Sequence, residues 1–173
     1  MDKNTLTLFA RYNKVCNEAM DTVIKTLKPE EWNRELGGFF KSVQGLCSHL
    51  YVCDFNWLKR FSTFRDFVAL KDPLFNRERY SFKELLFEDM ADYLSARPVL
   101  DEKISAFAAE LSPADMEGLL KYTDSSGTPN ERNFGGLIMQ SLNHDTHHRG
   151  MISLCLEILG RENDFSSFGQ VIK

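Results

Sequence analysis

The sequence predicts an all-α protein, a bundle of four long helices joined by long connections. Four stretches carry apolar residues at alternating spacings of three and four, the period of a helix with one buried face. No stretch shows a convincing strand pattern of any length. Helices of this kind bury their apolar stripes against one another. We therefore expect one helical-bundle domain over residues 1–173.

The composition fits such a domain and argues against two classes of partner. A chain of 173 residues with 43% hydrophobic residues and 14 Phe can bury a sizeable core. Its 21 basic and 25 acidic residues leave a net charge of −4 with no long run of either sign, unlike a broad nucleic-acid-binding surface. No window approaches the roughly 18 apolar residues that span a bilayer, and no signal-peptide core is present. The four cysteines form no C-x-x-C pair, as is typical of a reducing compartment. We expect a cytoplasmic protein that binds neither nucleic acid nor membrane.

The first helix is expected over residues 6–27. Asn4 or Thr5 can cap its start, and Pro29 lies just beyond its end. One face of this helix would carry Leu8, Tyr12, Val15, Ala19 and Val23.

A second helix is expected over residues 39–61, after the breakers Gly37 and Gly38. Its apolar stripe reads Phe39, Val43, Leu46, Leu50, Cys53 and Trp57. His49 falls on this stripe and therefore faces inward. Asp54 and Asn56 lie close by in sequence, either as solvated residues or as acceptors that orient an imidazole N–H.

The third helix follows a long connection over residues 62–80, which predicts a loop that wraps the bundle or covers a site as a lid. Ser81, with Glu84 three residues later, has the capping-box arrangement. Helical spacing continues beyond Pro98, although a proline removes one intrahelical hydrogen bond. We expect one long kinked helix over residues 82–111, with a break into two helices as the alternative.

The last third of the chain contains a short helix, a reversal and the fourth long helix. The short helix is expected from Pro113 to about Leu120. Turn residues between 121 and 133 leave room for a small hairpin. The long helix is expected over residues 134–159, ending at Gly160. Its inward stripe reads Leu137, Ser141, His144, His148, Ile152, Cys155 and Leu159.

Three of the four histidines lie in the segment 143–150. His144 and His148 are four residues apart, so one helix face can aim both imidazoles at one point. His147 points about 100° away from His148. Because His49 also faces inward, the three imidazoles would either be buried without partners, which is costly, or share a cation. We predict a divalent-metal site formed by His49, His144 and His148.

Other metal arrangements are open to the same residues. Cys53 lies four residues after His49, so a closed structural site of Cys53 and the three histidines is chemically plausible. The late segment also matches the metalloprotease pattern H-E-x-x-H with Asp145 in the glutamate position, but no histidine follows His148. A di-iron carboxylate centre is disfavoured, because neither His49 nor His144 has a glutamate three residues before it.

Two stretches of the chain together resemble a known family. One leads from Phe39 to His49 and on to Asp54 and Trp57, and the other reads Asn143-His144-Asp145-Thr146-His147-His148-Arg149-Gly150. They look like the DinB/YfiT-like family, and the resemblance covers most of the chain in helix order. It implies a four-helix bundle of up-down-down-up topology with long crossover connections, commonly dimeric.

The resemblance also implies a metal site and a class of chemistry. The family's three metal-binding histidines map onto His49, His144 and His148, with zinc or nickel as the expected ion. Some members are similar to metal-dependent thiol transferases or isomerases that use low-molecular-weight thiols such as bacillithiol, mycothiol or glutathione, and many have no known activity. Where the family often continues Arg-Gly-Gln, this chain has Met151, which removes a polar side chain near the site.

Three neutral nitrogen ligands leave a coordination position open, as in catalytic metal sites. A water or thiol bound there loses its proton near neutral pH. We therefore expect a metal-dependent S-transferase or hydrolase-like enzyme that acts on a small thiol or an electrophile, working as a homodimer. Asp145, His147 and Arg149 are candidates for supporting roles. The alternative is a non-catalytic, stress-associated, metal-binding dimeric interaction module.

Overall fold

The computed structural model describes residues 2–172 and is mostly helical, as the sequence predicts. Its helices are α1 (Lys3–Ile24), the single-turn α2 (Pro29–Trp32), α3 (Val43–Phe61), α4 (Met90–Glu110) and α5 (Phe134–Ile158). Strands β1 (Leu119–Thr123) and β2 (Pro129–Asn133) pair antiparallel, with Leu119 opposite Asn133. Short 3₁₀ turns lie at Val68–Lys71, Pro73–Asn76, Asp115–Glu117 and Phe168–Gln170.

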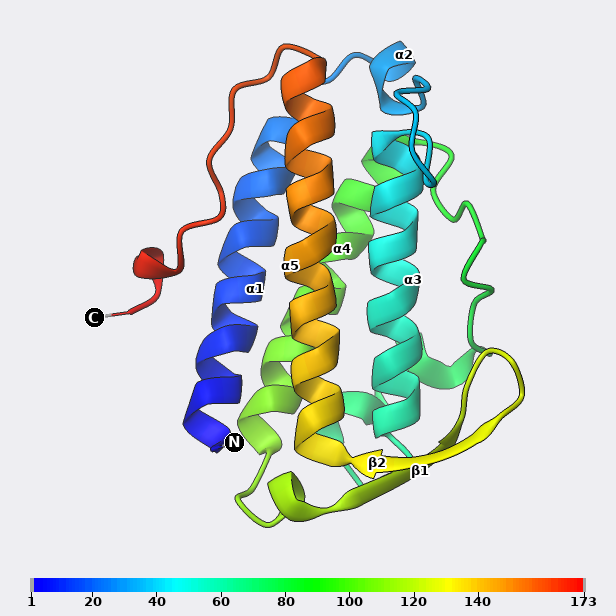
Figure 1. Cartoon of the computed structure of the whole chain (residues 1–173), viewed down its shortest axis with the longest axis vertical. Coiled ribbons are helices and arrows are strands. Elements are labelled where there is room, and N and C mark those ends of the chain that lie inside the picture. The colour runs from blue at the N-terminus through cyan, green and yellow to red at the C-terminus, as the bar shows by residue number, and fades with distance from the viewer. Residues whose placement is uncertain (1, 173) are drawn as a thin grey trace.

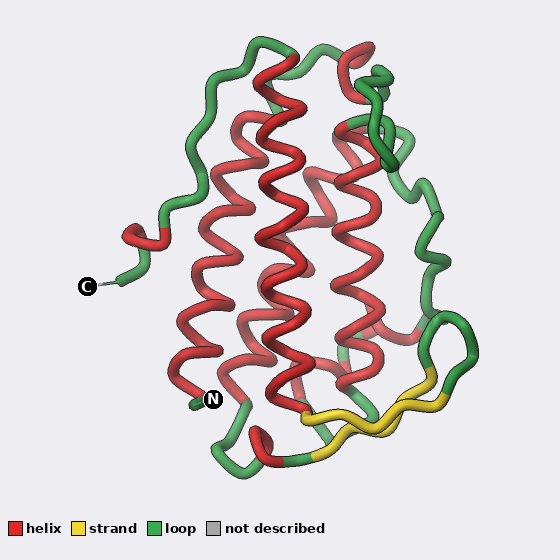
Figure 2. Tube along the Cα trace, viewed as in Figure 1, coloured by secondary structure: helices red, strands yellow, loops and turns green. Residues whose placement is uncertain are grey.

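The four long helices lie side by side with their axes roughly aligned (Figures 1 and 2). In Figure 1 the chain runs upward in α1 and α5 and downward in α3 and α4. All four helices contribute fully buried apolar side chains to one core, among them Leu6, Leu50, Leu100 and Ile152. Burying each such side chain stabilises the fold by about 1.5–3 kcal/mol. Within the described range, no helix is both long enough and apolar enough to cross a membrane.

The buried face of α1 differs from the predicted one. Asp2 caps the helix in place of Asn4 or Thr5, since its side chain accepts the backbone N–H of Thr5 at 3.0 Å. Of the predicted stripe only Tyr12 is buried; the other members are half-buried. The buried face instead carries Leu6, Ala10, Asn13, Asn17, Met20, Asp21 and Ile24. Because polar residues share this face, a criterion based on apolar residues alone selects the wrong side.

α3 begins later than the apolar spacing predicts. Gly37, Gly38 and Lys41 have φ angles of 86°, 71° and 69°, which are incompatible with a right-handed helix. Ser42 then caps the helix by accepting the backbone N–H of Gly45 at 3.1 Å. Phe39 therefore lies outside the helix and is 76% exposed. From Val43 onward the predicted stripe is confirmed, with Val43, Leu46, Leu50 and Cys53 buried and Trp57 half-buried.

The third long helix starts at Met90 and not at Phe82. Ser81 and Glu84 do interact, since the backbone N–H of Ser81 donates to the Glu84 carboxylate at 3.1 Å. They close an isolated turn, however, and the chain is irregular from there to the helix. The connection after α3 is consequently longer than predicted. α4 continues through Pro98 without a break into two helices.

The region between α4 and α5 is only partly as predicted. No helix extends to Leu120; a single 3₁₀ turn at Asp115–Glu117 leads directly into β1. The small hairpin is present, with Gly127 at φ 84° in its turn. α5 begins at Phe134, as predicted, and ends within one residue of the predicted position. Gly160, at φ 75°, follows it in the left-handed conformation expected after a helix.

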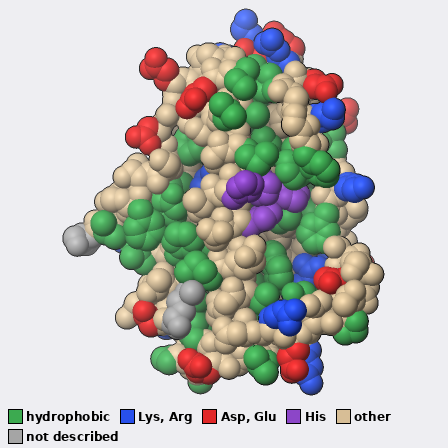
Figure 3. Space-filling view, in the orientation of Figure 1, with side chains coloured by type: hydrophobic (Ala, Val, Ile, Leu, Met, Phe, Trp, Pro, Cys, Tyr) green, Lys and Arg blue, Asp and Glu red, His purple; other side chains and the backbone are tan. Residues whose placement is uncertain are grey.

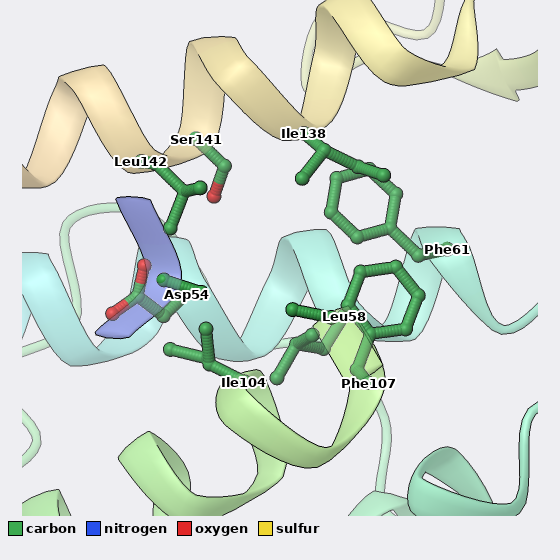
Figure 4. A pocket seen from close by; sticks show the side chains of 10 residues that line it. Asp54, Leu58, Phe61, Ile104, Phe107, Ile138, Ser141 and Leu142 are labelled. Atoms are coloured by element: carbon green, nitrogen blue, oxygen red, sulfur yellow. The ribbon is translucent and has the colours of Figure 1, made fainter. Parts of the chain in front are cut away.

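A small cavity lies in the core beside a buried carboxylate. Its volume is about 20 Å³, room for about one water molecule. Figure 4 shows Asp54 at one end of this cavity. Its other labelled side chains are apolar except Ser141: Leu58, Phe61, Ile104, Phe107, Ile138 and Leu142. The cavity therefore marks a boundary between the apolar core and a buried polar cluster.

Candidate metal centre

Two neighbouring helices bring the histidines together. His49 and Cys53 are one turn apart on α3, and His144 and His148 are one turn apart on α5, which packs against α3. Figure 3 shows histidine side chains gathered in one patch on this face of the molecule. Cys53 and His148 are buried, while His49 and His144 are half-buried. The inward stripes predicted for the two helices thus meet at one place.

The ligand atoms of His49, Cys53 and His144 have the spacing of a shared metal site. The two Nε2 atoms of His49 and His144 are 3.3 Å apart, and Cys53 Sγ lies 3.5 Å from His49 Nε2. Around tetrahedral zinc, with Zn–N of about 2.0–2.1 Å and Zn–S of about 2.3 Å, two nitrogens lie about 3.3 Å apart and a nitrogen and a sulfur about 3.6 Å apart. These three residues form a group that could hold a metal ion.

His148 lies against the same group. The centroid of its ring is 4.6 Å from that of His49 and 4.3 Å from that of His144. Its Nδ1 is buried and has no hydrogen-bond partner within residues 2–172. A buried polar atom without a partner is destabilising, and a metal ion beside the ring would be one way to relieve that cost. The residues whose ligand atoms fit a bound metal are thus His49, Cys53 and His144, and His148 lies beside them without belonging to that group.

Burial keeps the imidazoles neutral, which is the form that binds a metal. Burial, followed by the charge of His144, lowers the pKa of His49 to about 4. Burial and the neighbouring histidines lower the pKa of His148 to about 3. Burial also lowers the pKa of His144. At neutral pH, protons therefore do not compete for these three side chains.

Cys53 is held as a thiol in this environment. Burial raises the pKa of Cys53 far above its ordinary value, and the negative charges of Asp54 and Asp145 raise it further. Cysteine binds metals as the thiolate. Cys53 would therefore become a ligand only if the cation displaced its proton.

A cavity of about 290 Å³ opens beside His49. The ring of Phe40 forms part of its wall, with its centroid 4.3 Å from that of His49 and 5.3 Å from that of His148. Gly45 also lines the cavity, as do the exposed side chains of Phe39 and Leu85. This volume is close to the lower end of the range for small-molecule sites, about 300–1,000 Å³. His49 is therefore accessible from this opening, whose walls carry Lys83 and Glu84 beside the apolar side chains.

Asp145 and Arg149 are buried and bonded toward α1. Asn13 Nδ2 donates to Asp145 Oδ2 at 2.7 Å, and Arg149 donates to Asn13 Oδ1 and, at 3.2 Å, to Asn17 Oδ1. Asp145 Oδ1 lies 4.0 Å from His144 Nδ1, too far for a direct hydrogen bond. Both residues therefore support the helix that carries the histidines and do not line the cavity beside His49.

Arg97 of α4 extends this polar cluster to α3. It donates to Asp54 Oδ2 at 2.6 Å and to Asp101, which also accepts from Asn17 Nδ2 at 2.8 Å. Burial, followed by the charge of Asp145, raises the pKa of Asp54 well above its ordinary value. When one of the three carboxyl groups of Asp54, Asp101 and Asp145 keeps its proton, the positive charges of Arg97 and Arg149 balance the two remaining carboxylates. The cluster joins all four long helices.

The structure corrects the expectation of solvated residues near His49. Asp54 and Asn56 are both buried. Asn56 pairs with the backbone N–H and C=O of Tyr80 at 2.9 Å each, and Asp54 bonds to Arg97. Neither forms a hydrogen bond to a histidine within the described residues. His147, in contrast, is exposed, with its ring centroid 4.9 Å from that of His148.

Sequence reasoning missed the partners that hold this cluster: Asn13, Asn17, Arg97 and Asp101. A signal was present in their spacing, since Asn13, Asn17 and Asp21 recur every four residues on α1, and Arg97 and Asp101 are also four apart. Residues at this spacing share one helix face. A row of polar residues at helical spacing can therefore indicate a buried helix face, as an apolar row does.

Comparison with known proteins places this architecture in a family. The model of the DinB family matches residues 1–166. The chain is also similar to a protein named Protein DinB from Bacillus subtilis (strain 168), with 28% identity over 165 residues that cover 91% of this chain and 88% of that protein. Both matched ranges are long enough to include the helices that carry the histidines. The chain belongs to the DinB family.

Proposed function

We propose that this protein binds a divalent metal, zinc or nickel, through His49, His144 and His148, and acts as a metal-dependent S-transferase or hydrolase-like enzyme on small thiols and electrophiles. The observation that carries this proposal is the convergence of three imidazoles beside an accessible cavity of about 290 Å³. Catalytic metal sites keep a coordination position accessible, whereas purely structural sites are closed. The chain directions in Figure 1 support the further proposal of an up-down-down-up bundle.

A divalent cation held by neutral imidazoles supplies Lewis acidity, which lowers the pKa of a water or thiol in contact with it. The protein's own residues prepare the site for this role. Burial leaves His49 and His148 unprotonated at neutral pH. Asn13, bonded to Asp145, ties the turn of α5 that carries His144 to α1. These contacts hold the ligands in place before a substrate arrives, which is what catalysis at a metal requires.

The walls of the cavity favour a substrate with an apolar portion. The Phe40 ring shields one side of His49 from water, and Phe82 contributes a second aromatic surface. Exposed Phe39 and Leu85 extend this surface to the opening. An electrophile with an apolar skeleton would bury that skeleton here while its reactive carbon faces the histidines.

A second candidate is a non-catalytic metal-binding module, and one observation favours it. Cys53 Sγ lies within 3.5 Å of His49 Nε2, at the spacing of a fourth ligand. A site completed by Cys53 would be closed to substrates and would stabilise the fold or an assembly. The role of Cys53 therefore separates the two candidates.

Metal content tests the ligand set. Elemental analysis of the purified protein should find about one divalent ion per chain, and His49→Ala, His144→Ala and His148→Ala should each lose it. His147→Ala is the matched control, because this histidine is exposed and adjacent to His148. Metal retained at the wild-type level in all three ligand variants would rule out the site.

Activity tests the enzymatic role and uses Cys53→Ala to separate the candidates. Small thiols combined with an electrophilic dye should react faster with the protein than without it, and chelation should reduce this rate by at least about 100-fold. Cys53→Ala should retain both metal and activity, as should the control Cys155→Ala. Loss of metal in Cys53→Ala, together with no activity for any thiol, would favour the structural module.

A further inference from the structure

Arg60, in the last turn of α3, is a buried cation that has neither an ion-pair nor a hydrogen-bond partner among the described residues. Its side chain is only 7% exposed. Within residues 2–172 its guanidinium forms no ion pair and no hydrogen bond, and its Nε is fully buried. A charge removed from water without a hydrogen-bonded partner is strongly unfavourable. Burial of the Arg60 guanidinium in this state therefore lowers the stability of the fold.

The other buried arginines of the bundle show the usual solution. Arg97 donates to two aspartates, Asp54 and Asp101, and Arg149 donates to two asparagines. Arg60 has aromatic neighbours instead, with its guanidinium carbon 5.0 Å from the ring centroid of Trp57 and 5.8 Å from that of Tyr122. Aromatic rings hold a guanidinium in position, but they do not accept its N–H bonds in the way an oxyanion does. Its Nη groups, unlike the fully buried Nε, therefore remain available as hydrogen-bond donors.

A cavity of about 630 Å³ lies against Arg60. Its walls come from α3, from the segment that starts at Arg79 and from the turn of the β1–β2 hairpin, which Figure 1 shows beside the lower end of α3. Arg79 and Lys83 line the same cavity and are exposed, with no ion pair in the described part of the chain. Figure 3 shows basic side chains on this face between the histidine patch and the hairpin. The volume falls within the range of small-molecule sites.

The acidic residue at this cavity is already engaged. Asp124 accepts hydrogen bonds from the backbone N–H groups of Ser126 and Thr128 and from Asn130, all within the hairpin turn. It therefore stabilises the turn and leaves Arg60 unpaired. Burial, followed by the charge of Arg79, lowers the pKa of Arg60. Asp124 is thus the acidic residue that lines this cavity, and its charge acts on Arg60 without an ion pair or hydrogen bond between the two within the described residues.

We propose that this cavity is a binding site for the oxyanion group, phosphate or carboxylate, of a small molecule, with Arg60 as the central ligand and Arg79 and Lys83 as flanking cations. A guanidinium fork matches the two oxygens of such a group in a bidentate arrangement. The hydroxyl groups of Ser81 and Ser125, which also line the cavity, add neutral donors. Tyr80 and Phe82 offer ring faces to the rest of the molecule.

The site adjoins the histidine cluster but is independent of the metal. Phe82 and Lys83 line both this cavity and the one beside His49. A molecule anchored by its oxyanion at Arg60 would thus lie along the surface that leads toward the histidines. Anion binding should persist after the metal is removed, so that failure of one proposal can be distinguished from failure of the other.

Calorimetric titration of the metal-stripped full chain with inorganic phosphate, at constant ionic strength set by chloride, tests the site. Wild type should bind about one phosphate per chain with saturation, and Arg60→Leu should weaken binding at least about tenfold. Arg60→Lys, which keeps the charge but loses the fork, should fall between them. Arg132→Gln is the matched control, because Arg132 is exposed on the same hairpin but does not line the cavity. Acetate serves as the carboxylate probe, and the tighter of the two anions identifies the group.

Two results would overturn the proposal. One is the absence of saturable binding of either phosphate or acetate. The other is unchanged affinity in Arg60→Leu or, if that variant does not fold, unchanged affinity in both Arg79→Gln and Lys83→Gln. These two positions are exposed, so their substitution leaves the core intact. Each of the two should weaken phosphate binding by about threefold or more.

Discussion

Asp21 lies on the buried face of α1, and its Oδ1 has no hydrogen-bond partner within residues 2–172. Burial raises the pKa of Asp21 from 3.8 to about 7, against the attraction of Arg97. Between these values the folded state keeps a proton that the unfolded chain releases. The free energy of unfolding therefore declines as the pH rises from about 4 to about 7 and levels off above that interval. This single carboxyl favours the fold at acidic pH and opposes it at neutral pH.

Replacing Asp21 by asparagine should remove this dependence. At pH 4 Asp21→Asn and wild type should unfold at similar urea concentrations, because both side chains are neutral. At pH 8 the variant should be more stable, by at most ~4 kcal/mol. Urea unfolding at pH 4, 6 and 8 measures the difference. Glu18→Gln, an exposed neighbour on the same helix, should show no such pH-dependent gain, and a constant difference for Asp21→Asn would contradict the expected proton uptake.

At the scale of secondary structure, the loop before α3 is fitted closely to the helix it precedes. A Cβ on Gly45 would overlap the carbonyl oxygen of Phe40, whose ring packs on His49. Gly150, in the middle of α5, has no atom within 4 Å of the position its Cβ would take. The two glycines are therefore a matched pair, one required by packing and one tolerant.

Gly45→Ala should destabilise the protein by about 1–3 kcal/mol, because the backbone at Phe40 must move. It should also reduce metal content, since Phe40 then no longer supports the ring of His49. Gly150→Ala should raise stability by about 0.5–1 kcal/mol and leave the metal unchanged. Thermal unfolding and elemental analysis of both variants provide the measurement. Equal metal content in the two proteins would show that Phe40 does not position His49.

The elements that could be predicted are those in which local signals and packing agree. α5 starts and ends where its periodicity and Gly160 indicate, and the inward stripe of α3 brings His49 to the predicted place. The prediction of a helix start at the capping-box pair of Ser81 and Glu84 was wrong, because this pair closes an isolated turn that no helix follows directly. The face of α1 was mispredicted because the residues it buries include Asn13, whose partners lie on α5. No local pattern reveals a partner on a distant helix.

At the scale of the whole molecule, the two candidate sites depend on segments that meet only in the folded chain. The histidine cluster joins α3 and α5, and the cavity at Arg60 joins α3, the segment near Arg79 and the hairpin. That His49, His144 and His148 lie close together could be predicted, because their spacing marks helix faces; their role as the metal ligands stays a prediction. The lack of an ion-pair partner for Arg60 among the described residues could not be predicted. Only the folded structure shows that Asp124 accepts its hydrogen bonds within the hairpin turn.

Metal removal should therefore lower the stability of the entire fold. A ligand present at 100 times its Kd stabilises the folded state by about 2.7 kcal/mol. For a chain of this size that corresponds to a decrease in Tm of about 5–10 °C upon chelation. Differential scanning calorimetry with and without a chelator measures the change, and His49→Ala should show none. An unchanged Tm after verified metal loss would mean that the metal contributes nothing to folding.

The buried ion pair between Arg97 and Asp54 also selects one alignment of the helices over its neighbours. Apolar side chains accept many partners, so an apolar seam alone tolerates a helix that slides along its axis. Sliding α4 past α3 by one turn, about 5.4 Å, would separate these two groups and leave the Arg97 guanidinium in the interior without this partner. Loss of this contact would lower the free energy of unfolding by roughly 3–5 kcal/mol. The contact between Arg97 and Asp54 therefore fixes the position of α4 along α3, which apolar contacts alone do not fix.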